Sequence, residues 1–137
     1  MPAIQRIHHA AIVVQDMQAG LHFWRDALGL QLDRIEDIPE QASRVAFLPM
    51  GDAEIELVLP TTDDSGIALY LAKRGPGIHH LCMEVDDLPA MLGRLRRHKV
   101  RLINEQPIAG AGGRLAAFVH PESTGGVLLE LYQAASS

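Results

Sequence analysis

Two stretches of the chain read almost alike: "IHHAAIVVQDM" at residues 7–17 and "IHHLCMEVDDL" at residues 78–88. His9 and His80 hold equivalent places in them, 71 positions apart, and the register continues without a gap. A repeat of this length is too long for the units of a solenoid and indicates two copies of one module. We therefore expect a pseudo-two-fold axis that relates the two copies.

Each copy predicts the same order of elements. An apolar run is followed by an aspartate suited to cap a helix, Asp16 in the first copy and Asp86 or Asp87 in the second. Apolar side chains at helical spacing follow in residues 17–30 and 88–100. Three strand-like runs then follow each helix, at 30–35, 43–50, 53–60, 100–105, 114–120 and 126–133. Each half thus predicts β-α-β-β-β.

The length of the chain favours a single domain. With 137 residues it lies near the modal domain size, so we expect one domain over residues 1–137. Within it, the first module covers about 5–60 and the second about 76–134. A helix is expected at 65–75 between the modules, and a glycine-rich turn at 110–113.

Composition excludes several classes of function. Hydrophobic residues make up 47% of the chain and charged residues 21%, which is typical of a folded protein. The net charge is −5, and the only basic cluster lies in the helix at 94–99, so nucleic acid is not an expected partner. No apolar run is long enough to span a membrane, and the N-terminus lacks the pattern of a signal peptide. The single cysteine, Cys82, fits a reducing compartment, and we expect a cytoplasmic protein.

Two glutamates repeat along with the histidines. Glu56 and Glu130 are 74 positions apart, close to the histidine offset, and both lie in otherwise apolar strands. A buried carboxylate without a partner costs several kcal/mol, so these positions call for a cation. We expect His9, Glu56, His80 and Glu130 to hold a divalent metal ion. Imidazole and carboxylate ligands suit Co²⁺, which we favour, and also Mn²⁺, Ni²⁺ or Zn²⁺.

Strand alternation restricts which histidines can be metal ligands, but it does not choose between the glutamates. Adjacent residues of a strand point to opposite faces, so one histidine of each "HH" pair can face the axis. Glu54 and Glu56 share a face, and alternation does not choose between them. Glu56 is the better match to Glu130 because each is followed by leucine.

The chain also resembles a known family, the methylmalonyl-CoA epimerases of the vicinal oxygen chelate superfamily, which includes glyoxalases, bleomycin resistance proteins and dioxygenases. The stretches that carry the resemblance are "PEQ" at 39–41, "VAFLPMGDAEIELVLP" at 45–60, "GIHHLCMEVDDL" at 77–88, "GAGGR" at 110–114 and "HPESTGGVLLEL" at 120–131. The resemblance implies an α+β fold in which two tandem βαβββ modules form a cupped mixed sheet around a metal site. Its metal ligands would be His9, Glu56, His80 and Glu130.

The activity implied by this resemblance is metal-dependent interconversion of (2R)- and (2S)-methylmalonyl-CoA. A proton is abstracted at C2 and returned from the opposite face, through a metal-stabilised enolate, so two acid/base groups are needed. Glu40 and Glu130 are the expected catalytic residues. Ser123 and Thr124 are expected to bind the substrate carboxylate.

The sequence departs from the family pattern near Glu40. Ala42-Ser43 stands where the family usually has Gly-Val, and Val45 stands where some members carry a carboxylate. A solvated loop position therefore remains an alternative for Glu40, and a plain hairpin turn remains one for residues 121–126.

Other features leave alternatives open. The phosphates of an acyl-CoA substrate would need cations, and Lys73, Arg74 and Arg114 are available without a spacing that singles them out. A lactoylglutathione lyase, or a metal-free binding protein of the same fold, would be a different function for a similar scaffold. The exposed edges of a cupped sheet favour pairing, so we expect a homodimer.

Overall fold

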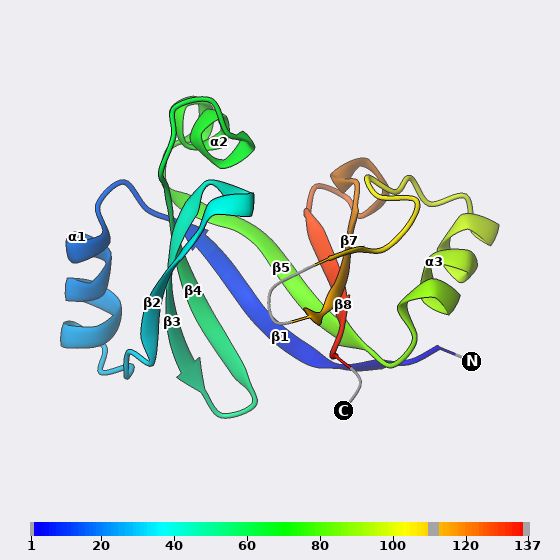
Figure 1. Cartoon of the computed structure of the whole chain (residues 1–137), viewed down its shortest axis with the longest axis horizontal. Coiled ribbons are helices and arrows are strands. Elements are labelled where there is room, and N and C mark those ends of the chain that lie inside the picture. The colour runs from blue at the N-terminus through cyan, green and yellow to red at the C-terminus, as the bar shows by residue number, and fades with distance from the viewer. Residues whose placement is uncertain (1, 110–112, 136–137) are drawn as a thin grey trace. The chain divides into compact units, whose positions relative to one another are not determined.

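The computed structural model describes residues 2–109 and 113–135, which form an α+β fold (Figure 1). The chain divides into two compact units. We call His9–His79 the N-unit, and Met1–His8 together with His80–Ser137 the C-unit. The division falls within the first strand, β1 (Ile4–Val13), which therefore contributes residues to both units.

The N-unit is a mixed sheet with its helices. Its strands lie in the order β2-β3-β4-β1, with β1 parallel to β4 and the other neighbours antiparallel. Its elements after β1 are α1 (Met17–Leu21), the π-helix η1 (His22–Ala27), β2 (Arg34–Ile38), the 3-10 helix η2 (Pro39–Gln41), β3 (Ser43–Met50), β4 (Ala53–Pro60) and α2 (Gly66–Arg74).

One face of the N-unit sheet packs against α1. As predicted, Asp16 caps this helix, because its Oδ1 accepts hydrogen bonds from the backbone N–H groups of Gln18 and Ala19. Gly20 allows a close approach, since a Cβ there would lie 3.2 Å from Cδ1 of Leu57. Seven buried residues form the cluster between helix and strands: Val14, Met17, Leu21, Ala46, Leu48, Ile55 and Leu57.

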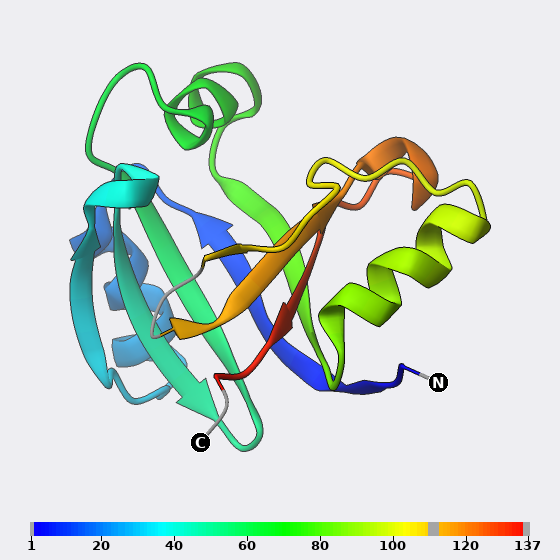
Figure 2. The same ribbon diagram turned by 45° about the vertical axis from the view of Figure 1, so that its right-hand side comes forward.

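The C-unit repeats this plan (Figure 2). Its strands lie in the order β1-β5-β8-β7-β6, with β5 parallel to β8 and β7 antiparallel to its neighbours. Asp87 caps its helix by accepting a 3.0 Å hydrogen bond from the backbone N–H of Ala90. The elements are β5 (Gly77–Val85), α3 (Leu88–Arg97), β6 (Ile108–Ala109), β7 (Leu115–Val119), the 3-10 helix η4 (Pro121–Ser123) and β8 (Leu129–Gln133).

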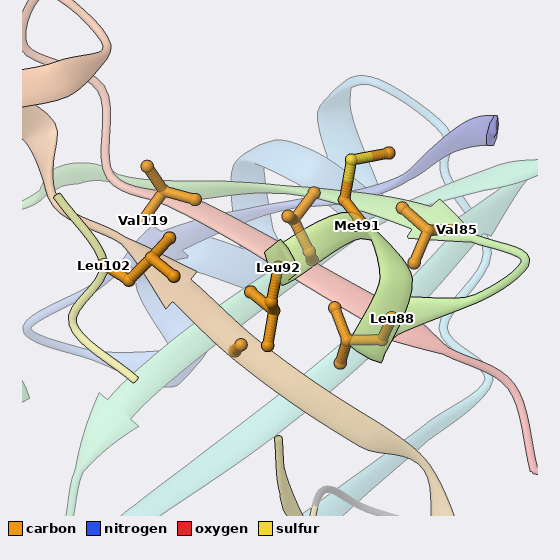
Figure 3. Close-up of a cluster of buried hydrophobic side chains, with 8 residues drawn as sticks. Val85, Leu88, Met91, Leu92, Leu102 and Val119 are labelled. Carbon is orange, nitrogen blue, oxygen red and sulfur yellow. The ribbon is translucent and has the colours of Figure 1, made fainter. Parts of the chain in front are cut away.

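The core of the C-unit lies between α3 and one face of its strands. Figure 3 shows the side chains that gather there, with Leu88, Met91 and Leu92 coming from the helix. The eight buried residues are Val85, Leu88, Met91, Leu92, Leu102, Ala117, Val119 and Leu131. In both units, therefore, a helix covers one face of the sheet, and in the N-unit Ile67 of α2 packs against a second buried cluster on the other face.

The predicted α+β fold of two βαβββ modules is confirmed, with three local corrections. The helix expected over 17–30 ends its α-helical part at Leu21 and continues as the π-helix η1. The strand expected over 30–35 forms at Arg34–Ile38 instead. Leu30 and Leu32 are drawn into the apolar cluster below α1, which explains the shift.

The strand expected over 100–105 is also wrong. Only Leu102 pairs there, in an isolated bridge to Val119, and the edge strand is β6. Oδ1 of Asn104 accepts a 2.8 Å hydrogen bond from the backbone N–H of Phe118. Because this side chain takes the place of a backbone acceptor, it competes with a regular strand ladder.

Two further expectations concern the glycine-rich turn at 110–113 and the limits of the two modules. Positions 110–112 of the expected turn at 110–113 lie outside them, and Gly113 has φ = 77°. The module limits of 5–60 and 76–134 stay a prediction. Among the described residues, no helix has the length and apolar character that crossing a membrane requires.

Candidate functional site

A histidine and a glutamate meet on the face of the N-unit sheet opposite to α1. Nδ1 of His9 lies 3.1 Å from Oε2 of Glu56, and the two side chains are only 8% and 13% exposed. Ile55 and Leu57 point into the cluster below α1, so strand alternation turns Glu56 to the opposite face. The pair thus lies on the side of the sheet that α1 leaves uncovered.

Glu54 lies close to the same pair. It is the direct neighbour of His9 across the parallel β1–β4 ladder. Ligand atoms of His9, Glu54 and Glu56 all lie within 4.8 Å of one another. Alternation alone does not choose between the two glutamates, whereas the structure places Glu56 in direct contact with the imidazole.

The C-unit holds a second pair of the same kind. Nε2 of His80 lies 3.0 Å from Oε1 of Glu130, with side chains that are 11% and 16% exposed. Leu131 packs below α3, so Glu130 faces the opposite side of the sheet. The His80 ring also meets the ring of Phe118 edge-on, at 5.5 Å between centroids, which fixes its orientation.

Each unit therefore presents one largely buried imidazole–carboxylate pair from neighbouring strands. Two such donors fit a divalent cation, since both atom types bind Zn²⁺-like ions at about 2.0–2.2 Å. Four ionisable side chains that are largely buried also favour a compensating positive charge. The donor chemistry of His9, Glu56, His80 and Glu130 is thus suited to the metal ion that the sequence predicts.

Two residues of the C-unit escaped the sequence reasoning. His8 is buried and its ring meets that of Tyr132 edge-on, with 4.4 Å between centroids. Burial raises the pKa of Tyr132 well above its ordinary value of 10, and Arg114 lies 4.9 Å from the ring centroid. Tyr132 comes two positions after Glu130, so strand alternation could have placed it on the same face.

The predicted base Glu40 lies in η2, where it is exposed to solvent. The chain leaves η2 through Ala42, whose φ of 49° is in the left-handed region that favours glycine. Ser43 follows as a buried residue, and its Oγ has no hydrogen-bond partner among the described residues. Ala42-Ser43, which stands where the family usually has Gly-Val, thus places an alanine in the left-handed region and a buried hydroxyl without a partner among the described residues.

The hydroxyls of the predicted substrate-binding residues Ser123 and Thr124 form hydrogen bonds with backbone groups. Oγ of Ser123 accepts a 2.8 Å hydrogen bond from the backbone N–H of Arg101. The hydroxyl of Thr124 lies within hydrogen-bonding distance of the carbonyl oxygens of Pro121 and Val127, to one of which its single proton can be donated, and Oγ1 accepts from the N–H of Val127. These bonds shape the loop, and a contact with substrate stays a prediction.

A comparison with protein families agrees with this geometry. The model of the Glyoxalase/Bleomycin resistance protein/Dioxygenase superfamily matches residues 8–118. The chain belongs to this superfamily. The resemblance drawn from the sequence motifs is confirmed at this level.

Several similar proteins are methylmalonyl-CoA epimerases. The mitochondrial methylmalonyl-CoA epimerase of Mus musculus is 38% identical over 130 residues, which cover 94% of this chain and 73% of that protein. The crystal structure of methylmalonyl-CoA epimerase from Mycobacterium tuberculosis is 38% identical, with a TM-score of 0.88 and coverage of 97% and 90%. A single-residue variant of the Streptomyces coelicolor epimerase, in complex with 2-nitronate-propionyl-CoA, is 32% identical, with a TM-score of 0.89 and coverage of 98% and 100%.

Proposed function

We propose that this chain interconverts the two epimers of methylmalonyl-CoA at C2, with a divalent metal ion held by His9, Glu56, His80 and Glu130. The observation that carries the proposal is the repeated imidazole–carboxylate pair, 3.1 Å in the N-unit and 3.0 Å in the C-unit. Similarity to epimerases over nearly the whole chain supports the choice of substrate. Co²⁺ is our first candidate for the ion, followed by Mn²⁺, Ni²⁺ and Zn²⁺.

The chemistry requires a proton to leave C2 and to return on the other face. When bound, the metal supplies positive charge for the enolate oxygen of the thioester. Glu130 is our candidate for one acid/base group, in addition to its role as a ligand. Glu40, on the exposed η2, is our candidate for the other, since its carboxylate can exchange the abstracted proton with water.

Ser123 and Thr124 are proposed to bind the carboxylate of the substrate. Ser123 is exposed, and its hydroxyl can donate a hydrogen bond while it accepts the one from Arg101. In this position it would orient C2 towards the acid/base groups.

One exchange experiment tests the activity. Protein freed of metal by chelation is incubated with a single methylmalonyl-CoA epimer in deuterated water, without metal and with Co²⁺, Mn²⁺, Ni²⁺ or Zn²⁺ added in turn. We expect both epimers and deuterium at C2 only when the metal is restored. Absence of deuterium with each of the four metals would contradict the proposal.

Two variants sharpen this test. Glu130→Gln should abolish exchange, because it removes a ligand and a proton carrier together. Glu105→Gln is the matched control, since Glu105 is an exposed residue outside the site, and it should leave exchange unchanged. Equal rates in both variants would remove Glu130 from the mechanism.

We further propose that the chain acts as a homodimer. Short edge strands such as β6 leave unpaired backbone groups that another copy can cover. Sedimentation equilibrium at several concentrations measures the mass of the particle, and a value of 15.0 kDa throughout would contradict the dimer.

A further inference from the structure

The helix α2 ends in two adjacent cations, Lys73 and Arg74, both exposed. Among the described residues, neither of them pairs with a carboxylate. The nearest acidic residues in the sequence, Asp63 and Asp64, precede the first turn of α2, at its other end. In a chain with a net charge of −5, this helix end is a local positive patch. Several arginines elsewhere do have carboxylate partners, among them Arg6, Arg25, Arg34, Arg44, Arg96 and Arg101.

Tyr70 holds this helix end in place. Its hydroxyl donates a 2.7 Å hydrogen bond to the carbonyl oxygen of Ile78, at the start of β5. Its ring meets that of His79 edge-on, with 4.8 Å between centroids, and the guanidinium of Arg74 lies 5.8 Å from the ring centroid. A guanidinium held over an aromatic ring loses less freedom when it binds an anion.

Apolar side chains border the two cations. Leu69 is 60% exposed and Ile78 is 67% exposed, the highest values among the exposed large hydrophobic residues. Leu69 lies one turn before Lys73 on the helix, as Tyr70 lies before Arg74. Exposed apolar surface beside paired cations suits a ligand that carries both a flat organic ring and phosphates, as the adenine nucleotide part of CoA does.

The helix α2 also lies on the side of the sheet where the candidate site lies. Ile67 of α2 packs against a cluster of Ala11, Val45, Phe47 and Val58. Val58 is two residues after Glu56 on β4, so it shares the face of the His9–Glu56 pair. In contrast, Arg97 belongs to α3, which covers the face of the C-unit sheet opposite to Glu130.

We propose that Lys73 and Arg74, positioned by Tyr70, bind the phosphates of the CoA part of the substrate. This inference rests on the proposed function for the identity of that substrate. Two adjacent cations can form charge-assisted hydrogen bonds to the pyrophosphate and the 3′-phosphate, and these bonds weaken with salt.

Calorimetric titration tests this phosphate site without any catalytic step. The probes are CoA, methylmalonyl-CoA, dephospho-CoA, ADP and pantetheine. The proteins are the wild type, Lys73→Gln, Arg74→Gln, Arg114→Gln, and Arg97→Gln as a control of equal charge change. We expect each of the first two variants to bind CoA roughly tenfold more weakly than the wild type, as for the loss of a charged hydrogen bond. Pantetheine, which carries no phosphate, should bind all five proteins equally.

Each outcome of the titration decides a different point. Equal CoA affinity in the wild type and in Lys73→Gln and Arg74→Gln overturns the phosphate site and leaves the epimerase proposal standing. A loss in Arg114→Gln alone also overturns it and assigns the phosphates to the C-unit. A wild type that binds neither CoA nor methylmalonyl-CoA overturns the proposed function itself. Binding of ADP as tight as that of CoA would show a general nucleotide site and overturn the assignment to CoA.

Discussion

Nδ1 of His9 lies 3.1 Å from Oε2 of Glu56, on the neighbouring parallel strand. Two glutamates of β4 share a face, and only Glu56 makes this contact. Glu54 lies directly opposite His9 in the ladder and yet does not make it. A pair at this distance can share a hydrogen bond or bind one cation together.

Replacing Glu56 by glutamine should weaken Co²⁺ binding. A neutral amide is a poorer ligand than a carboxylate. We expect the affinity for Co²⁺ to fall at least tenfold, which is roughly the loss seen when a residue that hydrogen-bonds to a metal ligand is removed. Titration calorimetry with Co²⁺ measures the effect. Glu54→Gln, on the same strand and face, is the matched control and should lower the affinity for Co²⁺ less. An equal or larger loss in the control would assign the ligand role to Glu54.

Two serine-to-alanine substitutions should change stability in opposite directions. Oγ of Ser43 is buried without a partner among the described residues, so Ser43→Ala should raise the free energy of unfolding by about 1 kcal/mol. Oγ of Ser65 caps α2 by accepting a 3.1 Å hydrogen bond from the N–H of Ala68, so Ser65→Ala should lower it by about 1 kcal/mol. Urea unfolding measures both values, and a loss of stability in Ser43→Ala would show that this hydroxyl has a partner.

Two helical glycines should differ when replaced by alanine. A Cβ at Gly93 meets only side-chain ends of arginines, at 3.7 Å or more, and the gain in helix propensity is about 1 kcal/mol. A Cβ at Gly20 would lie 3.2 Å from Leu57 and 3.3 Å from Val14, so crowding offsets that gain. Thermal unfolding should show Gly93→Ala to be the more stable variant. The reverse order would contradict the close approach of α1 to its sheet.

Stability should fall at high pH because of Tyr132. Burial raises the pKa of this tyrosine in the folded protein above its ordinary value of 10. The stabilisation of the folded protein by this neutral, buried tyrosine is therefore fully present below pH 10. It is lost as the pH rises above 10, because the tyrosine of the unfolded chain ionises first. Urea unfolding from about pH 8 upward, compared between the wild type and Tyr132→Phe, measures it. A wild type whose stability falls no more steeply than that of Tyr132→Phe would contradict the raised pKa.

Much of the fold is readable in the repeat. The two "IHH" stretches, each followed by an aspartate that caps a helix, predict two βαβββ modules, and β3 and β4 form at the predicted residues. The predictions that failed concern segments where side chains compete with backbone pairing. The side chain of Asn104 replaces a ladder acceptor, and Leu30 and Leu32 enter a core rather than a strand. Such competition depends on neighbours that are distant in the sequence.

The sequence by itself determined which residue types the candidate site offers, because strand alternation and repetition require only the order of residues. Two histidines and two glutamates in apolar strands already predict a cation. Only the tertiary structure decided that Glu56 contacts His9 and that α2 packs through Ile67 on the face of this pair. The physical reason is that a period of two assigns each side chain to a face of its sheet, whereas the distance between two side chains on one face depends on how strands and helices pack.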